Sequence, residues 1–239
     1  MGRQSRWLIL GIVMLVLAGA ITPVYGQAIH LTVQAGYDGL FRENQWLPVY
    51  IQASNDGPAV EGRLLVRPET SGNGLANTYS LPISLPEGAR KGAVLYIAAR
   101  SFANQLRIEL MTHDGVVVAS QNASLRVIQP QDQLSVLISG ATAGAIDWSG
   151  VRTGGYNAFQ ANWRLENLPE QPAALTAVDR LIFNDVDTGT LSTGQRQAVA
   201  DWVAQGGHLV VTGGTGWQAT AAGLTDLLPL LPNNSATVP

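Results

Sequence analysis

The feature of the sequence that most constrains the fold is a helical pattern enclosed by two short apolar runs. The runs read LIFNDV at residues 181–186 and HLVV at residues 208–211, and both have the length of a buried strand. The residues between them repeat their apolar side chains at helical spacing. A strand, a helix and a strand in this order predict a parallel sheet with right-handed crossovers.

The ends of the helix can be predicted from local signals. Ser192 and Gln195 have the S-x-x-Q spacing of a capping box, which predicts the first turn. Gly206 and Gly207 predict the end, because glycine adopts the left-handed conformation at little cost. The predicted apolar face holds Ala198, Val199, Trp202 and Val203, and we expect Trp202 to fill the space against the sheet.

Residues 28–128 follow a different pattern, in which apolar and polar residues alternate. AIHLTVQA and WLPVYIQAS are examples, and NDG, PEGARKG and HDG supply turn residues between such segments. Eight short segments of this kind, including VVVASQ and ASLRVIQ, predict an antiparallel, immunoglobulin-like β-sandwich.

The pattern changes at QPQDQ, residues 129–133, which we interpret as a linker. LSVLISG then forms a nearly continuous apolar run, typical of a strand buried on both faces. We expect a second strand in FQANWRLENLP and one or two helical turns in ALTAVDR. The α/β domain is therefore expected over residues 134–232, followed by a polar tail at 233–239.

Residues 1–26 have the layout of a secretory signal peptide. Arg3 and Arg6 precede an uncharged, mostly apolar run at residues 8–21, and Val24 and Gly26 lie just before the expected cleavage point. The run is short for a spanning helix, which needs about 20 residues. We therefore expect an exported, extracytoplasmic protein of the cell envelope, or one associated with the membrane. The alternative is an uncleaved N-terminal anchor.

The composition argues against several classes of function. The chain of 239 residues contains no cysteine, which removes disulfides, thiolate metal sites and a cysteine nucleophile. Its formal net charge is −3, and no basic stripe is visible that would mark a nucleic-acid-binding surface. We expect no metal, no cofactor and no nucleic-acid partner.

The segment LIFNDVDTGTLSTGQRQAVADWVAQGGHLVVTGGTGW resembles the class I glutamine-amidotransferase-like fold, a flavodoxin-like α/β domain. The resemblance is to a branch of exported and membrane-anchored bacterial proteins of unassigned function, in which a β-sandwich often precedes this domain. GYDGLFRENQWLPVYIQASNDG is similar to the start of such a sandwich.

Members of this branch usually run on past the position of Pro239, often to a C-terminal membrane helix. The resemblance therefore implies an incomplete flavodoxin-like parallel sheet. Either the sequence is a fragment, which we favour, or the domain is a reduced version. A missing C-terminal part would be a second route to membrane association.

The enzymatic members of the fold attack glutamine with a cysteine on a strand-to-helix elbow, assisted by a histidine. This chain has no cysteine and no G-x-S-x-G elbow, and His208 has no evident nucleophile partner. The resemblance therefore implies the fold and not the catalytic residues.

Candidate ligand-binding residues follow the predicted strands, since ligands of open α/β sheets bind beyond the carboxyl ends of the strands. This rule places Asp185, Asp187, Gly213, Gly214 and Thr215 around one crevice. The alternative, which we favour, is that these residues only form turns. GGTGWQA lacks the full dinucleotide fingerprint, and the G-K-S/T of a phosphate loop is absent, so nucleotide binding is not expected.

These observations predict a non-catalytic exported envelope protein that acts in binding or scaffolding. Its partner would be an unidentified protein or envelope component. The alternative function is a hydrolase-type enzyme with its site in the strand-end loops of the α/β domain.

Overall fold

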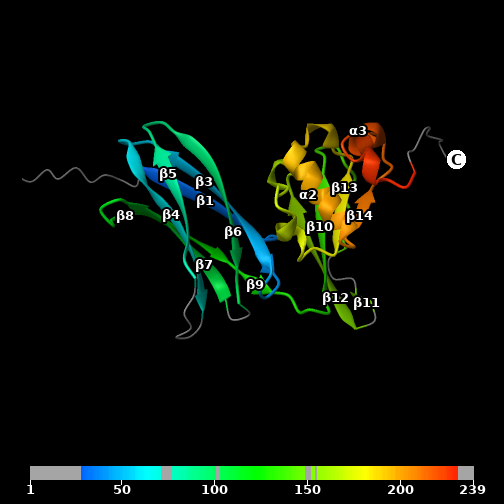
Figure 1. Cartoon of the computed structure of the whole chain (residues 1–239), viewed down its shortest axis with the longest axis horizontal. Helices are drawn as coiled ribbons and strands as arrows, with labels where there is room; N and C mark the ends of the chain where they lie inside the picture. The colour runs from blue at the N-terminus through cyan, green and yellow to red at the C-terminus, as the bar shows by residue number, and fades with distance from the viewer. Residues whose placement is uncertain (1–27, 71–76, 101–102, 149–151, 154, 231–239) are drawn as a thin grey trace, which may run out of the picture.

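The structure is a computed structural model. It describes residues 28–70, 77–100, 103–148, 152–153 and 155–230. The expected signal peptide at 1–26 and the expected polar tail at 233–239 lie outside these residues. The described part of the chain forms a strand-rich β-sandwich and an α/β body that follows it (Figure 1). No helix in the described ranges has the length and apolar character needed to cross a membrane.

The first half of the chain is built from two antiparallel sheets, as the alternating pattern predicts. One sheet has the order β1-β3-β6, with bounds Ile29–Ala35, Trp46–Asn55 and Arg90–Ala98. The other has the order β5-β4-β7-β8, with bounds Tyr79–Leu85, Val60–Thr70, Ala103–Thr112 and Val117–Ser124. The inner faces pack together through alternate residues, among them Val49, Ile51, Leu64, Ile108 and Leu110.

The sandwich differs from the predicted set of strands near its end. The segments VVVASQ and ASLRVIQ form two strands as predicted, but their boundary is shifted, because β8 runs on through Ser124. The next residues form β9 (Arg126–Val127), which pairs in parallel with β2 (Leu40–Phe41). The chain leaves the β7–β8 pairing at this point because its hydrogen-bond partner changes: the Arg126 N–H donates to Gly39 O at 2.8 Å.

The second half contains a five-stranded sheet with the order β11-β12-β10-β13-β14. Four of these strands run parallel to one another: β10 (Gln133–Ser139), β12 (Tyr156–Trp163), β13 (Arg180–Asn184) and β14 (His208–Val211). The short β11 (Arg152–Thr153) pairs with β12 in the antiparallel sense. All residues of β10 from Leu134 to Ile138 are buried, as the continuous apolar run predicts.

The helix α2 (Thr193–Ala204) begins and ends where its sequence signals predict. Ser192 and Gln195 form the capping box, and Gly206 follows the helix with a φ of +100°. Trp202 is buried against the sheet, with 4% of its surface exposed. Gly207 must lack a side chain, because a Cβ there would lie 2.2 Å from the indole Cε2 of Trp202.

The remaining helical segments are short and lie in the connections of the α/β body. FQANWRLENLP contains the end of β12 and then a 3-10 helix, Leu165–Asn167. The helical turn expected in ALTAVDR is the end of a second 3-10 helix, Pro172–Leu175. The 3-10 helix Thr188–Thr190 follows β13, and α3 (Trp217–Ala222) follows β14. The 3-10 helix Thr225–Leu227 comes after α3.

Candidate functional site

The crevice at the carboxyl ends of the strands is centred on Asp185, which follows β13 directly. Asp185 adopts a φ of +50°, a left-handed conformation that is uncommon for residues other than glycine. Its Oδ1 accepts a hydrogen bond from the Gly216 N–H at 2.8 Å. A Cβ at Gly216 would lie 2.1 Å from the same oxygen, so glycine is needed for this approach.

The other residues expected to line this crevice differ in their distance from Asp185 and in their hydrogen bonds. Asp187 caps its own 3-10 turn, because its Oδ1 accepts from the Gly189 N–H at 2.9 Å. Gly214 lies beside Asp185, since a Cβ there would be 3.8 Å from the Asp185 Cγ. Gly213 and Thr215 are exposed in the loop after β14. The structure therefore brings Asp185 and Gly214 together, whereas Asp187 is engaged in local turn geometry.

Sequence reasoning missed a buried polar residue next to Asp185. Asn184 is 6% exposed, and its Nδ2 donates to Gly144 O at 2.9 Å. Its Oδ1 accepts from the Thr212 hydroxyl at 2.9 Å. Asn184 thus ties the loops after β10 and β14 to the end of β13. A polar residue at the end of the apolar run LIF was the signal that could have indicated this role.

Two threonines close the crevice on the side of α3. The Thr220 hydroxyl accepts from the Val186 N–H at 3.1 Å, and the Thr188 hydroxyl donates to Thr220 O at 2.9 Å. Both threonines are fully buried. The polar groups of the crevice therefore hydrogen-bond mainly to one another and to loop backbone, which is what turn and loop architecture requires.

The described surroundings of Asp185 provide neither a metal-binding cluster nor a histidine that could act with it. Within the described residues, no three His, Cys, Asp or Glu side chains gather in a way that could hold a metal ion. His208 begins β14 and Asp185 follows the end of β13, so they lie at opposite edges of the sheet. The strand between these edges is about 10 Å long, which keeps the pair from acting as base and nucleophile.

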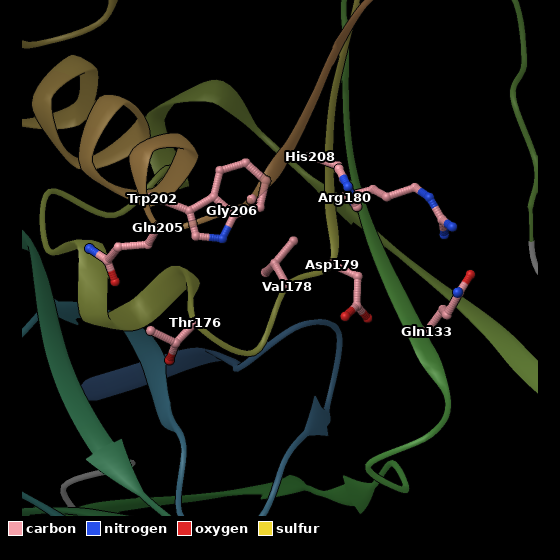
Figure 2. Close-up of a pocket in the computed structure, with 10 residues that line it drawn as sticks. Gln133, Thr176, Val178, Asp179, Arg180, Trp202, Gln205, Gly206 and His208 are labelled. Atoms are coloured by element: carbon pink, nitrogen blue, oxygen red, sulfur yellow. The ribbon is translucent and has the colours of Figure 1, made fainter.

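A cavity of about 320 Å³ lies at the opposite, amino-terminal edge of the sheet. In the view of Figure 2, Gln133, Asp179 and Arg180 lie at one end of it and Trp202, Gln205 and Thr176 at the other, with Val178 between them. The remaining lining residues are Gly206, Gly207 and His208. The sequence did not predict this cavity.

An arginine from the sandwich holds the residue at the charged end of the cavity. Arg42 Nη2 lies 2.5 Å from Asp179 Oδ2, which also accepts from the Leu134 N–H at 2.7 Å. The same guanidinium donates to Pro130 O at 3.0 Å and Asp132 O at 2.8 Å. The negative charge of Asp179 is therefore compensated from within the protein.

The two bodies meet on the outer face of the sheet β1-β3-β6, where aromatic side chains gather. Tyr37 stacks on Trp163 with ring centroids 5.2 Å apart, and Tyr50 approaches Trp163 edge-on at 6.3 Å. The Tyr37 and Tyr50 hydroxyls donate to Ala174 O and Asn167 O. Burial raises the pKa of both tyrosines, so they remain neutral donors.

A family model described as a domain of unknown function (DUF8726) matches residues 28–126, which is the sandwich. No curated protein matches the chain. The α/β body lies outside the range of the family match.

Several solved structures are similar to part of the chain. The CARDB domain of a Pyrococcus furiosus protein is 11% identical, with a TM-score of 0.32, and the match covers 42% of this chain and 87% of that one. A β-glucosidase from Erythrobacter marinus is 12% identical, with a TM-score of 0.32, over 42% of this chain and 15% of that one. A cycloisomaltooligosaccharide glucanotransferase from Paenibacillus sp. is 12% identical, with a TM-score of 0.32, over 75% of this chain and 27% of that one.

Proposed function

We propose that this protein is a non-catalytic, exported component of the cell envelope that acts by binding or scaffolding. The observation that carries the proposal is the state of Asp185, the best placed acidic side chain of the strand-end crevice. Its carboxylate accepts the Gly216 N–H and belongs to a loop that is closed by internal hydrogen bonds. A side chain engaged in this way supports architecture more than proton transfer or attack on a substrate.

The junction between the two bodies supports a scaffolding role. Besides the Tyr37–Trp163 stack, Asp38 Oδ2 accepts the Asn162 N–H at 2.6 Å, and Asn167 Nδ2 donates to Gln34 at 2.7 Å. These contacts tie the β1–β2 region of the sandwich to β12 and to the segment after it. A pair of domains held in one orientation can present a composite surface to a partner.

The α/β body also supports the proposed kinship with the amidotransferase-like, flavodoxin-like fold. Counted in chain order, its parallel strands β10, β12, β13 and β14 are arranged 2-1-3-4 in the sheet. The flavodoxin-like order is 2-1-3-4-5, so the four strands correspond to its first four. We propose this kinship for the fold alone, since the chain has no cysteine.

Export and partner binding can be tested together in a bacterial host. The full chain with a C-terminal tag should appear in the extracytoplasmic or envelope fraction, and a version that begins at residue 27 should remain in the cytoplasm. Cross-linking in the envelope fraction should join the protein to the same partner through both bodies. An equal cytoplasmic distribution of the two versions would contradict export, and cross-links to no component would contradict scaffolding.

A hydrolase is the second candidate, and one observation favours it. Asp185 occupies a strained backbone position at the carboxyl end of a parallel strand, and such positions are enriched at active sites. Glycines at 140, 214 and 216 leave the surroundings of Asp185 narrow but free of bulky side chains. If Asp185 acts as a general base or a nucleophile, turnover of the substrate should depend on its carboxylate.

A further inference from the structure

We propose that the cavity at the amino-terminal edge of the sheet binds a small hydroxylated organic acid, of the size of a sugar acid. The cavity lies beside the junction of the two bodies, where ligand sites often occur. Its volume of about 320 Å³ suits a single ring or a short chain. The site is separate from the strand-end crevice and does not depend on the proposed scaffolding role.

The charge balance of the lining favours an anion. Asp179 is the only acidic residue among the lining side chains, and Arg42 and the Leu134 N–H already hold its Oδ2. Arg180 has no hydrogen bond or ion pair from its guanidinium to any described residue. Arg180 therefore leaves an uncompensated positive charge at the cavity, which a carboxylate would neutralise.

The sheet itself brings a second donor next to this arginine. Arg180 of β13 and His208 of β14 are direct partners in the parallel register, so their side chains leave the same face of the sheet. His208 is exposed, and its ring makes no hydrogen bond within the described residues. We assign the carboxylate of the ligand to this pair.

The rest of the lining offers donors that suit hydroxyl groups. The side-chain amides of Gln133 and Gln205 have no hydrogen-bond partner in the described part of the chain. Figure 2 shows the indole nitrogen of Trp202 turned toward the space between Gln205 and Val178. An acid that carries hydroxyl groups supplies acceptors for these donors, and its carbon skeleton would lie along Val178 and Trp202.

Isothermal titration calorimetry on the full chain tests this assignment, with D-glucuronate, D-glucose and inorganic phosphate as probes at one ionic strength. Glucuronate should bind saturably in a 1:1 ratio. Glucose, which has the ring and not the carboxylate, should bind at least about tenfold more weakly, as expected for the loss of a charge-assisted hydrogen bond. Phosphate should bind more weakly than glucuronate, because it does not reach the donors at the Trp202 end.

Two variants and one control locate the binding. Arg180→Gln should weaken glucuronate at least about tenfold, and His208→Gln, at the exposed edge strand, should weaken it less. Arg63→Gln removes the same charge from the sandwich and should leave the affinity unchanged. The proposal would be overturned by absent glucuronate binding, by equal affinity for glucose, by tighter binding of phosphate, or by folded Arg180→Gln and His208→Gln variants that bind like the wild type.

Discussion

Tyr37 of the sandwich stacks on Trp163 of the α/β body, with an interplanar angle of 14° and ring centroids 5.2 Å apart. The two residues are 0% and 3% exposed, so the stack is part of a continuous core that includes both bodies. The buried side chains at the junction therefore join the cores of the two bodies. The two bodies should therefore unfold together.

Replacing Trp163 with alanine should separate the unfolding of the two bodies. Removal of a buried indole costs about 3–5 kcal/mol, and here it also removes the partner of Tyr37. Differential scanning calorimetry should show one transition for the wild type and two for Trp163→Ala. Trp148→Ala is the matched control, because Trp148 is 45% exposed. A single transition at the wild-type midpoint in Trp163→Ala would contradict a shared core.

Arg42 should contribute more to stability than an ordinary surface arginine. Its guanidinium joins Asp179, two backbone carbonyls of the linker region and Ala177 O, and its side chain is only 15% exposed. Arg42→Gln should lower the free energy of unfolding by about 1.5–3 kcal/mol. In Arg90→Gln, which breaks the exposed pair with Asp56, the loss should stay below about 1 kcal/mol. Equal losses in urea titrations of the two variants would show that Arg42 has no special role.

Asp132 should make the protein sensitive to acid. The Asn157 backbone N–H, and then its side-chain amide, donate to Asp132 and hold the pKa of this carboxyl below its ordinary value. A depressed pKa means that the stabilisation is present above the unfolded pKa near 3.8 and is lost as the pH falls through the folded pKa. The stability difference between the wild type and Asp132→Asn should therefore be larger at pH 6 than at pH 2. A difference that is constant with pH would rule this out.

Because the backbone at Asp185 has a positive φ, substitutions at this position should differ in how much they lower the free energy of unfolding. Asparagine tolerates a positive φ and keeps a side-chain oxygen for the Gly216 N–H, so Asp185→Asn should stay within about 1 kcal/mol of the wild type. Alanine loses the hydrogen bond and is strained at this φ, so Asp185→Ala should lose about 1–3 kcal/mol. Chemical denaturation of both variants checks the order, and a more stable alanine variant would contradict it.

The helix α2 and the four parallel strands of the sheet could be predicted because their signals are local. Ser192, Gln195 and Gly206 determine the ends of α2 through bonds and backbone angles within a few residues. The apolar run at β10 likewise matches a strand that is buried on both faces. Local signals of this kind do not depend on how the two bodies dock.

The junction and the amino-edge cavity could not be predicted because their contacts join distant parts of the chain. Arg42 and Asp179 are 137 residues apart, and so are Tyr37 and Ala174. No periodicity in the sequence connects such pairs. The strand-end residues were predicted only as a group, since the direction of Asp187 depended on a turn that it caps itself.

We propose that the strand-end crevice serves the architecture of the loops and is not a catalytic centre, and an assay of turnover is the decisive test. Purified full-length wild type and Asp185→Asn should be compared against panels of esters, amides and glycosides, after melts have established that the variant is folded. We expect any hydrolysis to proceed at the same rate with both proteins. Reproducible turnover by the wild type that the folded Asp185→Asn variant lacks would contradict this proposal.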